Sequence, residues 1–401
     1  MSIIRKLSVF SLVAVLAVVS FGVVPSNQPV AAQDTTLTIW HSWQDAEADL
    51  LETWVENFEE NSDVTVELRF IPFDDLRTTY ENAVATGEGP DLLIGQADWA
   101  GPLSSAGLIK PLGDLIADTD LEGHLSEAAW DLMAVAGEPY GVPVTLDGVA
   151  LYYNRDFIDD DEVPTDFDEM VELGNELTEG DDVGLLFNPG FYHTAGIYFA
   201  LGGQLFDEEF NNLWNTDDAA VRYLERHLQV FETNKAMYTG DNVLFRNGQA
   251  AMIVDGSWNL NTYREDLGDK LGLALLPEVD GVRWAPFFGG KGFYISSITD
   301  NEEAALEFLT FITSPEQLAL GAAIAGHIPP SDAVEVEDPY IATFSQQFAL
   351  GVALPTQGMD PYWGSLGDAI TAVTEGGEDP ATAAQAAQEA IEELLASSSE
   401  S

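Results

Sequence analysis

The alternation of apolar and polar residues predicts strands and helices in turn along the first hundred residues. Leu37 to Trp40 favours a short strand, and 45–61 carries apolar residues at helical spacing. Residues 63–70 alternate between apolar and polar side chains, as half-buried strands do. A helix that we expect Asp74 to cap leads to a buried strand at 92–94. This order predicts an α/β fold with a parallel sheet and helices on its faces.

The stretch from Tyr140 to Arg155 places one charge inside an apolar, β-prone run. Val144 to Leu146 and Val149 to Tyr153 favour two buried strands, and Tyr140 begins a turn. Asp147 lies between the two strands, and it is followed by glycine. One interpretation is a turn aspartate of the kind common in hairpins. The other is a functional carboxylate, which needs a partner because an unpaired charge is costly among apolar residues.

Turn and cap signals organise the second half of the chain. Asp166 and Thr216 are expected to cap helices, and Ser314 opens a capping box with Pro315 at the first helical position. The glycine-rich segment 287–295 lacks the following helix start of a phosphate cradle. We interpret it as an extended crossing between domains. The remaining predicted elements are strands at 250–254 and 272–276 and helices at 301–312 and 380–396.

Composition limits the classes of partner. A chain of 401 residues favours two domains over a single core. Its formal charge of −55, from 14 basic and 69 acidic residues, would repel nucleic acid and anionic lipid. Acids spread along the whole chain also suggest adaptation to high salt, which a rise of Tm with added salt would support. The absence of cysteine excludes disulfides, thiolate metal sites and a lipid-modified N-terminal cysteine.

The first 32 residues have the pattern of a signal peptide. Arg5 and Lys6 precede an apolar run at 7–24, and Val30-Ala31-Ala32 is a small-residue cleavage site. Cleavage after Ala32 would release an exported protein to the periplasmic or extracellular face of the cell envelope. The run is long for a signal, so an uncleaved membrane anchor is the alternative.

The chain carries few candidates for catalysis. The five histidines are scattered without ligand spacing, and neither a nucleophile elbow nor a nucleotide fingerprint occurs, so we expect no metal and no cofactor. Asp98 and Asp147 would suit the acid pair of a secreted glycosidase. Nothing in the sequence raises the pKa of either residue, so we expect a binding protein and not an enzyme.

Aromatic residues recur at predicted loops and strand ends: Trp43, Trp99, Tyr192, Trp258 and Trp363. For each one alone, core packing is the ordinary explanation. Together they lie beside turn residues and carboxylates, and ligands of parallel sheets bind beyond the carboxyl ends of the strands. Aromatic planes suit the C–H face of a sugar, and carboxylates accept hydrogen bonds from its hydroxyl rim. The pattern indicates an oligosaccharide site.

Spaced motifs extend this interpretation over nearly the whole chain: Leu37-Thr38-Ile39-Trp40, Ala85-Thr86-Gly87-Glu88-Gly89-Pro90-Asp91, Gly141-Val142-Pro143 with Leu151-Tyr152-Tyr153-Asn154, and Asp255-Gly256-Ser257-Trp258. With these motifs the chain resembles the extracellular solute-binding proteins of ABC sugar importers, in particular the maltose/maltodextrin-binding proteins. The resemblance implies two α/β lobes, each a mostly parallel sheet flanked by helices, with a ligand cleft at the hinge. Lobe I would comprise 33–146 and 289–339, and lobe II 147–288 and 340–401.

The resemblance also implies roles for single residues. Asp147 is similar to the hinge carboxylate of the family, Asp98 to its lobe I carboxylate, and Asp45 to a polar residue of its first loop. Tyr192, Trp258 and Trp363 are similar to the aromatics of lobe II that stack on glucose rings. The predicted ligand-binding set is Trp43, Asp45, Asp98, Trp99, Asp147, Phe191, Tyr192, Trp258 and Trp363.

Several positions depart from the family pattern. Gly95 replaces a tryptophan, Trp99 an arginine, and Gly190, beside Phe191, a glutamate; Gly364 and Gly367 replace a tyrosine and an arginine. Trp43 and Trp99 would then supply the missing stacking face.

The resemblance implies a monomeric protein that binds a malto-oligosaccharide or related sugar and delivers it to a membrane permease. The alternative cargoes are a non-glucose oligosaccharide or a glycerol phosphate ester, and the alternative class is a secreted glycosidase.

Overall fold

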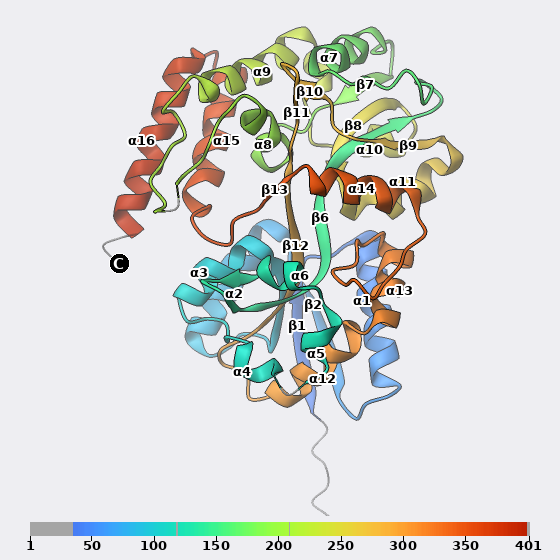
Figure 1. Cartoon of the computed structure of the whole chain (residues 1–401), viewed down its shortest axis with the longest axis vertical. Helices are drawn as coiled ribbons and strands as arrows, with labels where there is room; N and C mark the ends of the chain where they lie inside the picture. Colours follow the sequence, from blue (N-terminus) through green and yellow to red (C-terminus); the bar gives the residue numbers. More distant parts are fainter. Residues whose placement is uncertain (1–34, 118, 208, 399–401) are drawn as a thin grey trace, which may run out of the picture. The chain divides into compact units, whose positions relative to one another are not determined.

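The computed structural model describes residues 35–117, 119–207 and 209–398. The predicted signal peptide lies outside these residues. From Thr35 onward the chain forms one compact unit, in which two lobes are joined by β6 (Gly141–Asn154) and β12 (Phe287–Ile295) (Figure 1). The two-lobed α/β fold expected from the sequence is therefore confirmed.

Lobe I contains the predicted parallel sheet. β1 (Thr36–His41) pairs in parallel with β2 (Thr65–Phe70) on one side and with β3 (Leu92–Gln96) on the other, and β12 pairs antiparallel with β3. Its other elements are α1 (Asp45–Glu59), α2 (Phe73–Thr86), η1 (Ala97–Trp99), α3 (Ala100–Ser105), α4 (Gly113–Ile116), α5 (Leu121–His124), α6 (Glu127–Asp131), β4 (Ala134–Val135), β5 (Glu138–Pro139), α12 (Glu302–Ile312) and α13 (Pro315–Ala325).

Lobe II has a more mixed sheet than lobe I. β7 (Val183–Leu186) and β8 (Ala250–Gly256) are parallel, whereas β8 and β9 (Leu271–Ala274) both pair antiparallel with β6. Its other elements are α7 (Phe167–Glu176), α8 (Phe191–Ala200), α9 (Ala219–Thr233), η2 (Lys235–Met237), α10 (Val243–Arg246), η3 (Ser257–Asn259), α11 (Leu260–Leu267), η4 (Gly268–Lys270), β10 (Glu278–Val279), β11 (Val282–Arg283), α14 (Pro339–Ala349), β13 (Val352–Ala353), α15 (Asp360–Thr374) and α16 (Pro380–Ser398).

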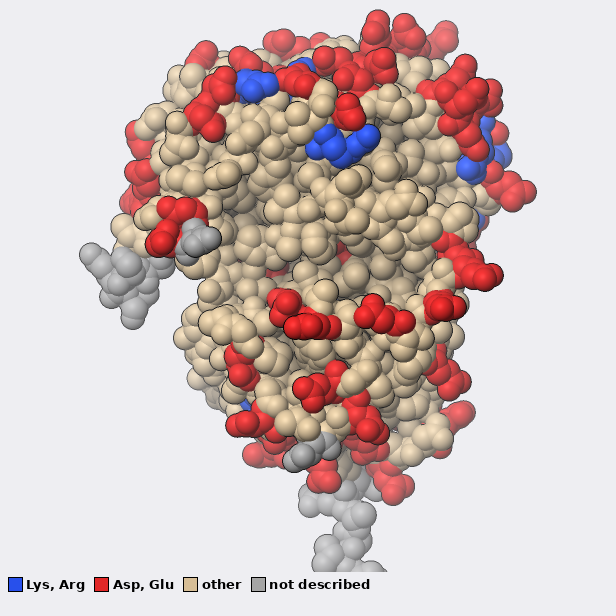
Figure 2. Space-filling model, viewed as in Figure 1, with Lys and Arg blue, Asp and Glu red and all other residues tan. Residues whose placement is uncertain are grey.

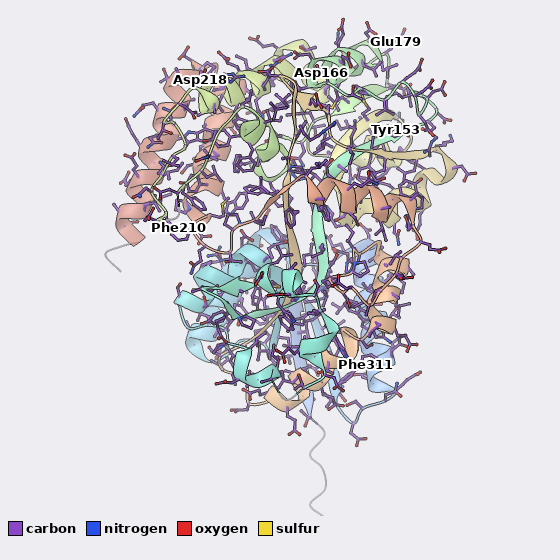
Figure 3. All side chains as sticks on the ribbon, in the orientation of Figure 1. Tyr153, Asp166, Glu179, Phe210, Asp218 and Phe311 are labelled. Carbon is purple, nitrogen blue, oxygen red and sulfur yellow. The ribbon has the colours of Figure 1, made fainter. Side chains whose placement is uncertain are left out.

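The buried apolar residues divide between the two lobes. Those of lobe I come from 37–144 and 293–325, and those of lobe II from 149–287 and 322–391. Figure 3 shows Phe311 of α12 in the lower lobe and Asp166, just before α7, in the upper one. The exact lobe bounds expected from the sequence remain a prediction.

β6 corrects the prediction of two strands separated by a turn. It is one continuous strand from Gly141. The predicted turn at Tyr140 is wrong, because Tyr140 is the single residue between β5 and β6 and the nearby turn lies at 136–137, between β4 and β5. Its first half pairs with β12 as far as Gly148, and its second half pairs with β8 from Val149. Because the strand changes partner without reversing direction, Asp147 lies inside a strand. The hairpin interpretation of this aspartate is wrong.

Of the predicted helix caps, only Asp166 bonds to the free backbone N–H groups at the start of its helix. Asp166 accepts hydrogen bonds from the backbone N–H groups of Asp168 and Glu169. Asp74 and Thr216 were wrong, because α2 begins at Phe73 and α9 follows Asp218. Asp74 instead lies in the first turn of α2, where a negative charge favours the helix dipole. α13 begins at Pro315 as predicted, but the side chain of Ser314 makes no capping bond.

Among the charged side chains on the visible face, acidic ones are spread over both lobes and basic ones are few (Figure 2). Within the described residues, no single helix is long and apolar enough to cross a membrane. The pair α12 and α13 meets that test together, with a bend of 67° between them.

Candidate ligand-binding cleft

A cavity of about 890 Å³ lies between the lobes and is lined by side chains from both. Lobe I contributes the loop after β1 with the start of α1, one face of α2, and the segment after β3. Lobe II contributes the first turn of α8, the residues around η3, and Trp363 of α15. Three of these lining segments follow the carboxyl ends of β1, β3 and β8. Ligands of open α/β sheets bind beyond the carboxyl ends of the strands.

Seven of the nine predicted residues line this cavity: Trp43, Asp45, Asp98, Trp99, Tyr192, Trp258 and Trp363. Asp147 and Phe191 do not line it. The structure thus brings together residues that lie far apart in the sequence. Their contact with a ligand remains a prediction.

The aromatic residues of the two lobes differ in how they face the cavity. Tyr192, Trp258 and Trp363 of lobe II are half-buried, and the rings of Tyr192 and Trp258 are 6.1 Å apart. Trp43 and Trp99 of lobe I are almost fully buried. A side chain with open surface is better placed to stack on a sugar, so the stacking face that we expect is mainly that of lobe II.

Each buried tryptophan of lobe I packs against other rings. Trp43 lies 5.3 Å from the ring of His327, and Trp99 stacks on Phe73 at 5.8 Å. These contacts give both residues a packing role at the wall of the cavity. We expected these two tryptophans to replace a missing stacking face. Little of either ring is exposed for a sugar to stack on.

Phe191 lies behind the cavity. It is 4% exposed, and its ring packs edge-on against Trp363 at 6.0 Å and against Phe287 at 6.1 Å. Phe191 therefore supports the position of Trp363 from below.

Asp147 has the partner that its burial requires. Its Oδ2 lies 3.4 Å from Lys291 Nζ, and its Oδ1 accepts a hydrogen bond from Ser257 Oγ at 3.2 Å. The carboxylate is 2% exposed, and Oδ2 accepts no hydrogen bond from the described residues. Asp147 therefore lies behind the cavity wall and pairs there with Lys291, which lines the cavity.

Lys291 joins Asp147 to lobe I. Its Nζ donates a hydrogen bond to Glu47 Oε1 at 2.6 Å, and His327 Nε2 lies 3.2 Å from the same oxygen. Glu47, Asp147, Lys291 and His327 form what we call the floor cluster. Burial would raise the pKa of Glu47, but the charges of Lys291 and His327 outweigh it and lower that pKa.

Asp98 is a cavity carboxylate whose pKa is raised. Burial raises its pKa to about 6, against the lowering effect of nearby Arg77 and in the same direction as the charge of Asp360. Its Oδ2 accepts a hydrogen bond from Trp363 Nε1 at 3.2 Å. A lobe I carboxylate is thereby bonded to a lobe II aromatic.

Further contacts connect the lobes beside Asp98. Arg77 of α2 donates two hydrogen bonds of 2.8 Å to the carboxylate of Asp360 at the start of α15. The backbone N–H of Gly101 donates to the carbonyl of Thr356 at 3.0 Å. Together with the bond between Trp363 and Asp98, we call these the rim contacts.

Glu47, Arg77 and Lys291 also line the cavity, and the ligand-binding set predicted from the sequence did not include them. Glu47 and Arg77 lie on amphipathic helices, where charged residues are ordinarily solvated. Lys291 carried a signal, because it is one of five lysines in the chain and lies within an apolar, glycine-rich strand. A buried charge in that position calls for carboxylate partners.

The site offers no support for metal chemistry. In the described part of the chain, no group of three or more histidine, cysteine or carboxylate residues is placed to hold a metal ion. The raised pKa of Asp98 would suit a general acid, but Asp147 is occupied by Lys291. The glycosidase pair expected as an alternative therefore lacks a free second carboxylate at Asp147.

Comparison with known proteins agrees with this architecture. Residues 53–344 match the family described as bacterial extracellular solute-binding protein. The chain is 28% identical to the maltotriose-binding protein of Pyrococcus abyssi over 83% of this chain and 76% of that protein. It is 24% identical to the galactooligosaccharide-binding protein of Bacillus subtilis over 97% of both.

Solved structures give the same picture. The maltotriose-binding protein of Thermus thermophilus, with maltotriose bound, superposes with a TM-score of 0.83 at 25% identity, covering 90% of this chain and all of that one. The maltose/maltodextrin-binding domain from Bdellovibrio bacteriovorus, also with maltotriose, gives 0.82 at 25% identity and the same coverage. Since the family match extends over most of its length, the chain belongs to the bacterial extracellular solute-binding proteins.

Proposed function

We propose that the protein captures a malto-oligosaccharide or a related neutral oligosaccharide in the cavity between its lobes. The observation that carries this proposal is the convergence of Tyr192, Trp258 and Trp363 with the carboxylates Asp45 and Asp98 around one cavity. Half-buried rings match the apolar faces of hexoses, and carboxylates match their hydroxyl rims. The names of the relatives point to the same class of ligand.

Binding would be coupled to closure of the lobes. A sugar that touches Trp258 of lobe II and Asp98 of lobe I gains both sets of contacts only when the lobes are together, so it favours that state. The exported, monomeric protein would then deliver its cargo to the membrane permease of an ABC importer, the assembly named in a streptococcal relative.

The charges around the cavity favour a neutral cargo over a glycerol phosphate ester. The lysine and arginine that line it, Lys291 and Arg77, are both paired with carboxylates. Asp45 and Asp98 also line it. A phosphate would meet these acids without a free cation to bind it.

A thermal-shift screen followed by calorimetry tests the proposal. Maltose, maltotriose, maltotetraose and a galactooligosaccharide are compared with glycerol 3-phosphate, and we expect a shift only with the oligosaccharides. Trp363→Ala should weaken binding about 10- to 100-fold by removing a stacking face. Failure of all the sugars to bind would refute the proposal. Release of shorter sugars on incubation with maltotriose would instead indicate a glycosidase.

A further inference from the structure

Two charged residues that the sequence analysis did not assign meet beside Trp258. Both line the cavity: Glu47 from the first turn of α1 and Lys291 from β12. Glu47 is 8% exposed and Lys291 is 7% exposed. The Lys291 ammonium lies 5.4 Å from the centroid of the Trp258 ring. A sugar ring seated on Trp258 would therefore lie next to this ion pair.

The hydrogen bonds of the pair leave capacity for a ligand. Both hydrogen bonds that the Glu47 carboxylate makes with described residues involve Oε1, one from Lys291 and one with His327. Its Oε2 makes none there. The ammonium has three N–H donors, and its contacts with protein acceptors are Glu47 Oε1 at 2.6 Å and, more distantly, Asp147 Oδ2 at 3.4 Å.

Lys291 stays charged in this position. Burial alone would lower its pKa, but the charges of Asp147 and Glu47 outweigh that effect and raise it. A charged donor and a charged acceptor form stronger hydrogen bonds than neutral groups do. The pair therefore offers both a strong donor and a strong acceptor at one place in the cavity wall.

We propose that Glu47 and Lys291 form a subsite that reads one hydroxyl of the hexose stacked on Trp258. The hydroxyl donates its hydrogen to Glu47 Oε2 and accepts one from Lys291 Nζ. A hydroxyl satisfies both partners, whereas a deoxy or O-methyl position leaves at least one charged group unpaired. The subsite thus selects neutral sugars with a free hydroxyl at that position. This inference rests on the proposed function.

The test is a double-mutant cycle between protein and ligand. The wild-type chain and Lys291→Met are titrated by calorimetry with maltotriose and with a panel of monodeoxy maltotrioses. One deoxy analogue should bind the wild type about 10- to 100-fold more weakly than maltotriose does. Lys291→Met should bind maltotriose more weakly, and its penalty for that analogue should be smaller than that of the wild type, because only Glu47 is left to bond the hydroxyl.

Two further variants complete the design. Lys270→Met is the matched control, because Lys270 is an exposed lysine paired with Asp156 in lobe II, away from the cavity; it should keep the full deoxy penalty. Glu47→Gln retains the shape of the side chain and loses its charge, so it should reduce the same penalty even if Lys291→Met fails to fold.

The outcomes separate this inference from the proposed function. If the wild type binds maltotriose and both variants keep every deoxy penalty, the pair has a packing role only and the inference is overturned. If maltotriose does not bind, the same cycle is run with monodeoxy forms of the sugar selected by the thermal-shift screen. If no sugar binds at all, both proposals fail.

Discussion

Two regions join the lobes with the same kinds of side chain, but they differ in their exposure to water. In the floor cluster, the paired side chains of Lys291 and Glu47 are 9% and 10% exposed. In the rim contacts, those of Arg77 and Asp360 are 24% and 47% exposed. Water screens an exposed pair and solvates its members when they part, whereas a buried charge that loses its partner has no such substitute. We therefore expect the ion pairs of the floor cluster to stay formed, and the rim contacts to break and re-form.

Their positions in the fold agree with this difference. Lys291 and Asp147 lie on β12 and β6, the strands that pass through both lobes, so the floor cluster can stay intact while the lobes rotate. Arg77 and Asp360 lie on α2 and α15, one in each lobe, so their contact must break when the lobes separate. We expect mutations in the floor to affect stability and mutations in the rim to affect closure.

The largest effect is expected for Lys291→Met. It leaves the buried carboxylates of Glu47 and Asp147 without their cation, and breaking a buried pair in this way costs about 3–5 kcal/mol. Urea unfolding measures the loss, with Lys270→Met as the exposed counterpart, which should lie within about 1 kcal/mol of wild type. Equal losses in both variants would show that burial does not set the strength of these ion pairs, and the expected difference between the buried floor and the exposed rim would lose its basis.

Gly101→Ala should act as a wedge at the rim. A Cβ at this position would lie 2.2 Å from the carbonyl oxygen of Thr356, so the two segments must move apart. Such strain costs about 1–3 kcal/mol, and it should appear as weaker sugar binding and a larger radius of gyration by small-angle scattering. Gly123→Ala, whose Cβ would meet nothing within 4 Å, is the control. An unchanged affinity would show that closure tolerates a looser rim.

The pH dependence of binding tests Asp98. Its pKa of about 6 means that the carboxylate becomes protonated as the pH falls below 6 and can no longer accept a hydrogen bond through a charged oxygen. Affinity should therefore decrease about tenfold between pH 7 and pH 5, and Asp98→Asn should abolish this dependence.

The same titration has the opposite sign for stability. Because the pKa is raised above its ordinary value of 3.8, protonation relieves a buried charge, and this group favours the folded state more as the pH falls from 6 toward 4. A loss of affinity caused by acid unfolding would be accompanied by a lower Tm, whereas titration of Asp98 would not require one.

The smallest effect is expected for Asp360→Asn. The exposed pair with Arg77 should contribute about 1 kcal/mol or less to closure, so sugar affinity should fall no more than about fivefold. The difference from wild type should shrink in about 1 M salt, where screening acts within about 3 Å. Asp156→Asn removes an exposed pair within lobe II and should leave affinity unchanged. A large loss of affinity that does not depend on salt would show that the Arg77–Asp360 pair behaves like the buried ion pairs of the floor cluster.

The sequence by itself determined the local elements and the chemical character of the cleft. The spacing of apolar residues predicted β1, α1 and β3, because an element with one buried face has apolar residues at regular intervals along the sequence. Tryptophans beside turns and carboxylates indicated a sugar site, since few other ligands suit both groups. The capping aspartate Asp166 was predictable because a cap bonds to amides only two or three residues away.

Only the tertiary structure decided which of these residues meet. Asp147 was recognised as a charge in need of a partner, but that partner, Lys291, lies on another strand, and no local pattern connects the two. The same holds for Arg77 and Asp360, and for the burial of Phe191 behind Trp363. Periodicity records whether a side chain is buried. It does not record against what, because that depends on packing between elements distant in sequence.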